Sequence, residues 1–329
     1  MQQNKENSDL LPSLSTHFQA TLVVLWYAGN TFYNVYNKTA LNMIHAHWFV
    51  ASAQLAVGIV VSLLMWLSGV RKMPNLSGSD IKSCMPIGLF ASLAHCGTVL
   101  ASAVGAVSFA QIVKACEPVF AAVVGLLIPP IDVKPTLAYI MLLPIVGGVG
   151  LACVKEGKGI DINVQAFLFA SMANLAAALK GKLGSSVTKA LKSDATKNMD
   201  AANVYGVMNI ISFFFTVPFV VFTELPTLKE TWEEAVAEHG STEVTKNILV
   251  SGLAFYFYNE CAFAFTAHVG SVTSSVLNTA KRVIIIVVSA IVFQEAMERN
   301  TVIGSAIAIC GTFAYSLTSK APAPKKKKE

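Results

Sequence analysis

The sequence predicts an all-α membrane protein with ten transmembrane helices, arranged as two inverted five-helix repeats. Of its 329 residues, 54% are apolar and only 13% are charged, whereas a soluble domain usually has about 25% charged residues. The mean hydropathy is +0.59. Together these values exclude a soluble enzyme, a disordered protein and a nucleic-acid-binding protein, because only lipid accommodates so much apolar surface.

Ten apolar stretches have the length of about 20 residues that crosses a bilayer. They lie at 21–44, 47–70, 83–104, 108–129, 135–154, 162–184, 203–224, 247–268, 271–293 and 300–318. The third and fourth are nearly fused, as are the eighth and ninth. The expected domains are an N-terminal tail (1–20), a first repeat (21–154), a linker (155–161), a second repeat (162–318) and a basic C-terminal tail (319–329). The acidic segment 226–243 predicts a short surface helix.

The distribution of Lys and Arg predicts the orientation. An even number of spans puts both tails on one side, and that side carries 13 cations against five on the other. The positive-inside rule therefore places both termini in the cytosol or its equivalent. The polar start, Met1 to Phe18, has no basic segment followed by an apolar core, and we expect a soluble tail rather than a cleaved signal.

A weak internal repeat appears when the chain is aligned with itself at an offset of 165 residues. The segments that begin at Gly105 and Gly270 share a glycine, a following valine, a hydroxyl residue, a mid-helix cation and an aliphatic run. A span with a central glycine follows each, Gly147 in one half and Gly311 in the other. Two five-span halves must insert in opposite orientations, which is a common plan of transporters with a substrate site between the halves.

Charged residues inside the spans indicate the kind of substrate. Lys281 and Arg282 are adjacent near the middle of a span, where an ionisable residue costs about 2.5–3.5 kcal/mol on insertion scales. They predict an anion clamp, since Arg offers a planar fork to phosphate oxygens and Lys adds a point charge. The alternative is a structural ion pair with Glu117 or Glu260.

Lys114 lies in the corresponding span of the other half. Its alternative partner is Glu117, three residues on and on the same helical face. We expect Pro118 to interrupt this helix and to free backbone for ligand contact. One cation per half, meeting between the halves, would suit a dianionic phosphate.

Several other polar residues lie within the apolar spans. His95 and Thr98 share a face, and the chemistry leaves a packing role and a binding role equally open. Tyr258 and Asn259 could donate hydrogen bonds. Three further asparagines predict contacts between helices: Asn30, Asn34 and Asn37. The six cysteines form no Cys-x-x-Cys pair, and we interpret them as small buried apolar residues.

Five segments resemble the plastid sugar-phosphate/phosphate translocators, a branch of the drug/metabolite transporter superfamily. They are WYAGNTFYNVYNK (26–38), VSFAQIVKACEPVF (107–120), NMDAANVY (198–205), FYFYNE (255–260) and LNTAKRVIIIVVSAIVF (277–293). The resemblance covers nearly all of the chain from Trp26 to about Leu317 and implies the drug/metabolite transporter fold. Its His and Tyr pair resembles the triose-phosphate class more than the hexose-phosphate or phosphoenolpyruvate classes.

The resemblance implies a role for each matching residue. Lys114, Lys281 and Arg282 match the cations that hold the phosphate group, and Thr98 matches a hydroxyl that assists them. His95 and Tyr258 match residues that read the three-carbon end of the substrate. A further family arginine, which grips a second anionic group, is replaced here by Lys180, or alternatively by Lys182. Lysine lacks the bidentate geometry of arginine.

The implied function is strict antiport of inorganic phosphate against phosphorylated three-carbon metabolites, triose phosphate and 3-phosphoglycerate, by alternating access. We expect no enzymatic activity, no metal and no cofactor, and the chain has no Walker motif. The expected partners are these substrates and membrane lipids, with no nucleic acid. The oligomeric state is open, and a functional monomer is compatible with the pattern.

The implied location is a plastid envelope, with an outer membrane of a complex plastid as one choice. The alternative is a nucleotide-sugar or other sugar-phosphate antiporter of the Golgi or endoplasmic reticulum. That alternative draws on Lys326 and Lys327, which resemble a dilysine retrieval signal, although a polybasic tail on anionic lipid explains them equally well. A third class, a membrane receptor or scaffold, has no need of a repeat or of midplane cations.

Overall fold

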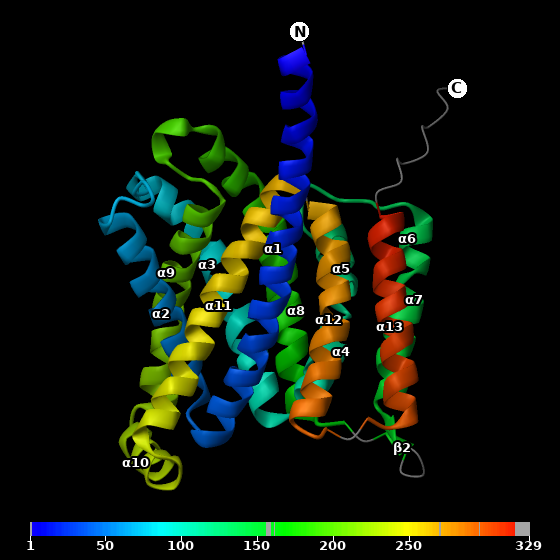
Figure 1. Cartoon of the computed structure of the whole chain (residues 1–329). Coiled ribbons are helices and arrows are strands. Elements are labelled where there is room, and N and C mark those ends of the chain that lie inside the picture. The colour runs from blue at the N-terminus through cyan, green and yellow to red at the C-terminus, as the bar shows by residue number, and fades with distance from the viewer. Residues whose placement is uncertain (1, 156–158, 161, 270, 296, 320–329) are drawn as a thin grey trace.

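The computed structural model describes residues 2–155, 159–160, 162–269, 271–295 and 297–319. Its helices run side by side in one bundle, with the start of α1 and the end of α13 on the same face (Figure 1). The elements are α1 (Gln2–Met43), α2 (His47–Leu67), α3 (Gly78–Val104), α4 (Val107–Lys114), α5 (Glu117–Leu127), α6 (Thr136–Ile140), α7 (Leu142–Ala152), β1 (Val154–Lys155), β2 (Gly159–Ile160), α8 (Val164–Ser193), η1 (Ala195–Lys197), α9 (Ala201–Phe219), η2 (Val220–Glu224), α10 (Leu228–His239), α11 (Ser241–Val269), α12 (Ser271–Val292) and α13 (Arg299–Thr318).

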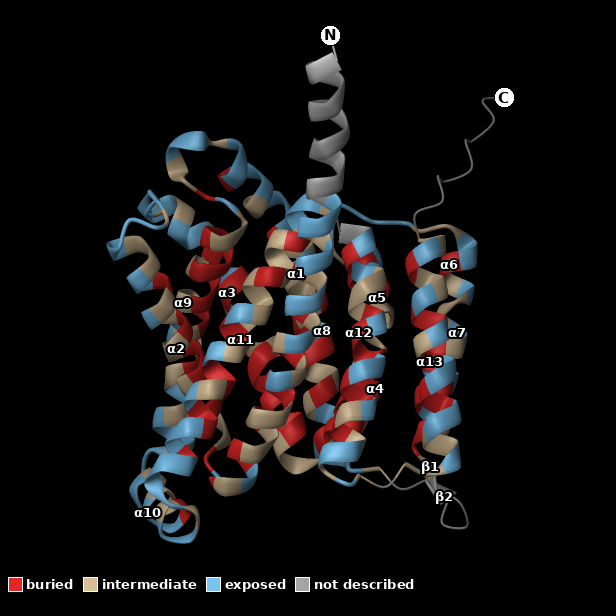
Figure 2. Ribbon diagram, viewed as in Figure 1, coloured by how far each residue is buried: buried red, intermediate tan, exposed pale blue. Residues whose placement is uncertain are grey.

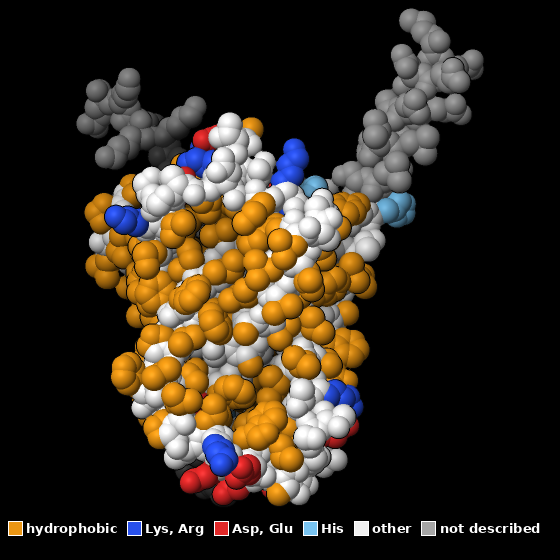
Figure 3. All heavy atoms as spheres, turned by 90° about the vertical axis from the view of Figure 1, so that its left-hand side faces the viewer, with side chains coloured by type: hydrophobic (Ala, Val, Ile, Leu, Met, Phe, Trp, Pro, Cys, Tyr) orange, Lys and Arg blue, Asp and Glu red, His pale blue; other side chains and the backbone are white. Residues whose placement is uncertain are grey.

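Eight helices in the described part of the chain are long and apolar enough to cross a membrane. They are α2, α3, α4 with α5, α8, α9 with η2, α11, α12 and α13. Of the other two predicted spans, one lies within the more polar α1, and the other is the shorter apolar segment Thr136–Ala152. Many residues along the outside of the bundle are exposed (Figure 2). On the face in Figure 3, apolar side chains cover the middle of the bundle and charged ones gather toward its ends, as lipid contact requires.

Two of the predicted spans are broken, and a proline explains each break. Proline has no N–H to donate to the carbonyl four residues earlier. Pro118 stands four residues after Lys114, where α4 ends, and Pro144 stands four residues after Ile140, where α6 ends. The sequence predicted the interruption by Pro118, and the structure has it between Lys114 and Glu117. The predicted continuous helix over 135–154 is instead two helices, α6 and α7.

Other boundaries also differ from the predictions. Helix α1 begins at Gln2, inside the expected tail, and α8 continues to Ser193 instead of ending near 184. The acidic segment does form a surface helix, α10. The short antiparallel pair β1 and β2, in the expected linker, was not predicted. Cys310 is exposed, so the expectation that every cysteine is buried is wrong there. Residues 156–158 and 161 of the linker, and the lysines from Lys320 onward, lie outside the described residues.

The two halves pack together through matching sets of helices. Helix α3 packs on α8 as α1 packs on α11, and α3 packs on α9 as α2 packs on α11. Helices α4 and α12 pack against one another, as do α2 with α9 and α7 with α13. The cavity described below is lined by all of these helices except α7 and α13.

Helices α7 and α13 approach until their backbones touch. A Cβ atom added to Gly148 would lie 2.5 Å from the backbone nitrogen of Ala308 and 2.6 Å from the carbonyl oxygen of Gly304. Small residues permit such close contact between membrane helices. A Cβ on Gly147 would meet no atom within 4 Å, so the glycine that packs is Gly148 and not the Gly147 noted in the sequence.

Two carboxylates from the second half bind helix N-termini of the first half. Glu224 accepts hydrogen bonds from the backbone N–H groups of Trp48 and Phe49, at 2.9 and 2.7 Å. Glu295 accepts from those of Val107 and Ser108, at 2.7 and 3.0 Å. A carboxylate satisfies the unpaired N–H groups of a helix start and complements its dipole. These contacts fix α2 and α4, and α4 carries Lys114.

Candidate functional site

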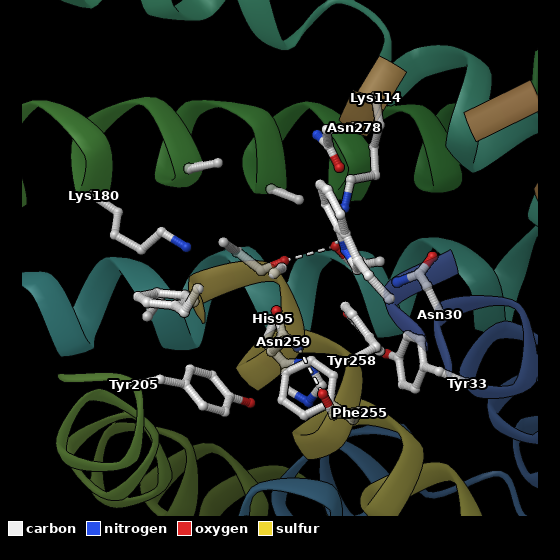
Figure 4. Close-up of a pocket in the computed structure, with 18 of the residues that line it drawn as sticks. Asn30, Tyr33, His95, Lys114, Lys180, Tyr205, Phe255, Tyr258, Asn259 and Asn278 are labelled. Atoms are coloured by element: carbon white, nitrogen blue, oxygen red, sulfur yellow. Dashed lines mark hydrogen bonds between the residues drawn. The ribbon is translucent and has the colours of Figure 1, made fainter. Parts of the chain in front are cut away.

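One cavity brings together all seven residues that the sequence singled out. It has a volume of about 260 Å³ and is lined from α1, α2, α3, α4, α5, α8, α9, α11 and α12. Its walls include His95, Thr98, Lys114, Lys180, Tyr258, Lys281 and Arg282. In Figure 4, Lys180 and Tyr205 lie on one side of the cavity, and Lys114, Asn30 and Tyr33 on the other.

Lys114 ends α4 and is held by a hydroxyl from α3. Its Nζ donates to Thr98 Oγ1 at 2.8 Å, and that hydroxyl donates in turn to the Ala94 carbonyl at 2.8 Å. In the described part of the chain no ion pair joins Lys114 to Glu117, so that alternative is wrong for Lys114. The partner of the Lys114 ammonium group is thus a hydroxyl rather than a carboxylate.

Arg282 does form the ion pair that the sequence left as an alternative. Its guanidinium lies 2.7 Å from Glu117 Oε2, and only 6% of the Arg282 side chain is exposed. The two residues are 165 positions apart, which is the offset of the internal repeat. Glu260, the other candidate partner, pairs with Arg71 at 2.5 Å. In the ion pair with Glu117, one guanidinium nitrogen of Arg282 donates to one carboxylate oxygen. The other N–H groups of the guanidinium remain available for a ligand.

Lys281 faces aromatic rings. Its Nζ lies 5.1 Å from the ring centroid of Trp26 and 5.5 Å from that of Tyr258. A cation over an aromatic face gains about 0.5–2 kcal/mol, which is less than a carboxylate would supply inside the membrane. No salt bridge involves Lys281 among the residues that the structure describes.

The cavity carries a strong positive charge. Its walls include four cations, Lys114, Lys180, Lys281 and Arg282, and one carboxylate, Glu117. Counted in their ordinary ionised forms, four cations and one carboxylate give a formal net charge of +3, at a site where attraction is screened much less than in water. Such a site favours an anion that carries more than one charge.

The break between α4 and α5 exposes backbone carbonyls, and side chains of the second half bind them. Asn174 Nδ2 donates to the Val113 carbonyl at 2.9 Å, and Thr312 Oγ1 donates to that of Ala115 at 3.0 Å. Unpaired backbone groups at membrane depth must find such partners. Both carbonyls therefore have partners within the protein. The carbonyl that Pro118 leaves without its helical partner is that of Lys114, four residues earlier, and the expectation that Pro118 frees backbone for a ligand stays a prediction.

His95 and Tyr258 form the aromatic wall between the two sides of the cavity. His95 Nε2 lies 3.2 Å from the Ala51 carbonyl, and because a carbonyl only accepts, Nε2 carries the proton. The ring centroids of His95 and Phe255 lie 4.1 Å apart, and those of Tyr258 and Tyr33 lie 5.4 Å apart. The neighbouring rings thus hold both side chains in fixed orientations.

Lys180 lines the cavity, whereas Lys182 donates to the backbone carbonyl of Pro130. Lys180 is therefore the cation of α8 that a ligand in the cavity would meet. The sequence did not single out Tyr205 and Asn209, which also line the cavity. Their spacing of four residues within an apolar span was the signal that could have revealed them.

The comparisons with known proteins agree with this geometry. Residues 18–316 match the Triose-phosphate Transporter family. The chain is 31% identical over 306 residues to the chloroplastic xylulose 5-phosphate/phosphate translocator of Arabidopsis thaliana, covering 93% of this chain and 70% of that protein. It is 31% identical over 319 residues to the chloroplastic triose phosphate/phosphate translocator of Zea mays, covering 96% of this chain and 74% of that protein.

A relative of another specificity is almost as similar. The chain is 29% identical over 303 residues to the chloroplastic phosphoenolpyruvate/phosphate translocator 1 of Oryza sativa subsp. japonica, covering 92% of this chain and 72% of that protein. Overall identity therefore does not distinguish between the named substrates, and the cavity itself has to do so.

Proposed function

Because this chain belongs to the Triose-phosphate Transporter family, and is a transporter rather than an enzyme, we propose that it is a strict antiporter of inorganic phosphate and phosphorylated three-carbon metabolites. The observation that carries the proposal is that four basic side chains and only one carboxylate line one cavity, a formal net charge of +3. A phosphate ester is near −2 at neutral pH and offers oxygens to several donors at once.

We assign the phosphate group to Lys114, Lys281 and Arg282, with Thr98 positioning Lys114. His95 and Tyr258 contact the carbon chain, and Lys180 lies where a second polar group of the substrate would reach. Glu117 orients Arg282 through their ion pair. No step of this scheme needs a metal or a cofactor.

The same charges account for strict exchange. Closing an empty cavity would strip water from cations that have no carboxylate partner, which is costly. A bound phosphate offsets this cost, so the loaded carrier closes and reopens on the far side. The empty carrier closes poorly, and net transport in one direction is suppressed.

We propose that ten spans form two inverted repeats, 21–154 and 162–318, that alternate access to this cavity. Exchanging the halves converts the contact of α3 with α8 into that of α11 with α1, and the contact of α3 with α9 into that of α11 with α2. Such matched contacts are expected for a pseudo-two-fold axis in the membrane plane. The Arg282–Glu117 pair joins two equivalent positions and would lie near that axis.

We further propose a plastid envelope membrane as the location, since the relatives named above are chloroplastic translocators. We place both termini in the cytosol or its equivalent. The face with the connections 68–77 and 194–200 is then on that same side. That face carries more Lys and Arg than the opposite face, as the positive-inside rule requires.

Strict exchange predicts that uptake depends on what the vesicle contains. Purified protein in liposomes preloaded with phosphate should take up labelled phosphate at least about 10-fold faster than protein in empty liposomes, because only the loaded carrier returns. The measurement is initial uptake, with protein-free liposomes as the control. Equal uptake into loaded and empty vesicles would contradict exchange.

A nucleotide-sugar antiporter remains the second candidate, drawn from the lysine-rich C-terminal tail. The cavity volume of about 260 Å³ is below the ~300–1,000 Å³ usual for drug-sized ligands, which favours a small phosphate ester. Competition of phosphate uptake by triose phosphate, 3-phosphoglycerate and a nucleotide sugar distinguishes the two. We expect inhibition by the first two compounds only.

A further inference from the structure

One carboxylate lies among the cations of the cavity. In the part of the chain that the structure describes, Glu117 is the only acidic residue on the cavity wall, whereas four basic side chains line it. A negative charge beside an anion site weakens the binding of every anion that it repels. The position of Glu117 therefore needs a reason beyond the charge of the substrate.

The ion pair with Arg282 uses only one of the two carboxylate oxygens. Glu117 Oε2 accepts from the Arg282 guanidinium at 2.7 Å, and 36% of the Glu117 side chain is exposed, against 6% of that of Arg282. None of the described residues donates a hydrogen bond to Glu117 Oε1. Because Glu117 lines the cavity, Oε1 is the acceptor that it can offer to a ligand there.

Glu117 also lies close to the cations that we assign to phosphate. It begins α5, three residues after Lys114 ends α4, and its partner Arg282 directly follows Lys281 in α12. An anion that contacts these cations therefore comes close to the Glu117 carboxylate as well. The group of the anion that faces Glu117 must be a donor, because an ionised carboxylate only accepts.

Inorganic phosphate can make such a contact, and sulfate cannot. At neutral pH phosphate keeps at least one proton, as a P–OH group, whereas sulfate is fully ionised. The two anions are otherwise similar in shape, and HPO₄²⁻ has the same charge as sulfate. Cations attract both anions alike, so selection between them needs an acceptor that one satisfies and the other does not.

We propose that Glu117 is a specificity-determining residue, which accepts a hydrogen bond from the P–OH group of inorganic phosphate and repels sulfate. Lys114, Lys281 and Arg282 bind the ionised oxygens of the same anion. A fully ionised phosphate ester has no P–OH group, and its contacts through the carbon chain offset the repulsion from Glu117. The inference rests on the proposed function, since it requires phosphate at these cations.

Three anions of similar size test the role of the O–H group. Arsenate carries an O–H group, as phosphate does, whereas sulfate and monofluorophosphate carry none at neutral pH. Each anion is used to displace labelled phosphate from purified full-length protein in detergent at constant ionic strength. Arsenate should displace it at a concentration within about 3-fold of that of unlabelled phosphate, and the other two should need at least about 30-fold more, because they lose a charge-assisted hydrogen bond.

Glu117→Gln should remove most of this selection. Glutamine has no negative charge and offers N–H donors beside its oxygen, so the preference for phosphate over sulfate should fall below about 5-fold. Losing the ion pair with Arg282 affects both anions alike and cancels in the ratio. Glu260→Gln is the matched control, since Glu260 also pairs with an arginine, Arg71, but does not line the cavity. This control should keep the full preference.

A positioning role alone gives a different result. If Glu117 only orients Arg282, Glu117→Gln weakens phosphate and sulfate equally and the preference persists, which would overturn the inference. Equal displacement by sulfate and phosphate from the wild-type protein would overturn it without any variant and leave the proposed function standing. Failure of labelled phosphate to exchange in liposomes, with binding and selection intact, counts against the proposed function alone.

Discussion

Lys281→Ala is expected to lower the rate of phosphate exchange about 100-fold, measured as initial uptake into phosphate-loaded liposomes. Lys281 is 9% exposed and lines the cavity, its ammonium group lies over the rings of Trp26 and Tyr258, and it forms no salt bridge among the described residues. A charge-assisted hydrogen bond to phosphate contributes about 1.5–3 kcal/mol. Losing this bond at a site that must neutralise a dianion therefore impairs both binding and closure.

The stability of the same variant should change in the opposite direction. Without ligand, the Lys281 charge is buried with no carboxylate partner in the described chain, so Lys281→Ala should leave the melting temperature unchanged or raise it. Lys246→Ala is the matched control, because that lysine is exposed and pairs with Glu243 at 3.2 Å. Full transport by Lys281→Ala, or a marked loss of stability, would refute the assignment of Lys281 to phosphate.

Gly148→Ala is expected to lower the free energy of unfolding by about 2 kcal/mol or more. The new Cβ would lie 2.5 Å from the Ala308 nitrogen, and backbone atoms of α13 cannot rotate away as a side chain can. Helices α7 and α13 must therefore separate along their length, which forfeits the van der Waals contacts that hold membrane helices together. The measurement is the melting temperature of purified protein in detergent.

The neighbouring glycine supplies the control. Gly147→Ala adds the same methyl group to the same helix, where it meets no atom within 4 Å. Alanine favours a helix over glycine by up to about 1 kcal/mol, so this variant should be as stable as the wild-type protein or slightly more so. Equal melting temperatures for both variants would refute the close approach of α7 and α13.

The Arg282–Glu117 pair shows which part of an ion pair can be predicted from the sequence and which part cannot. The offset of 165 residues places the two positions in register, and the sequence already offered Glu117 as one of two partners for the cation pair. It offered Glu260 equally, because both carboxylates lie at membrane depth. The structure assigns Glu260 to Arg71 and Glu117 to Arg282, a choice that depends on the lateral position of helices far apart in the chain.

Hydropathy and composition by themselves determined the class of protein, the approximate position of most helices and the cations that line the cavity. These properties are local: each apolar stretch must satisfy its own backbone in lipid, and a charge inside it stands out from its neighbours. Pro118 and Pro144 also marked their helix breaks locally, since each removes one hydrogen bond to a residue four positions earlier.

Only the tertiary structure decided which of these groups meet. It paired Lys114 with Thr98, separated Lys180 from Lys182, made Gly148 rather than Gly147 the packing residue and bound the Asn209 amide to the Leu55 carbonyl. Adjacent residues in a helix point about 100° apart, so neighbours in sequence face different surroundings. What a polar side chain binds depends on the helices that surround it, and that arrangement is a property of the packed bundle.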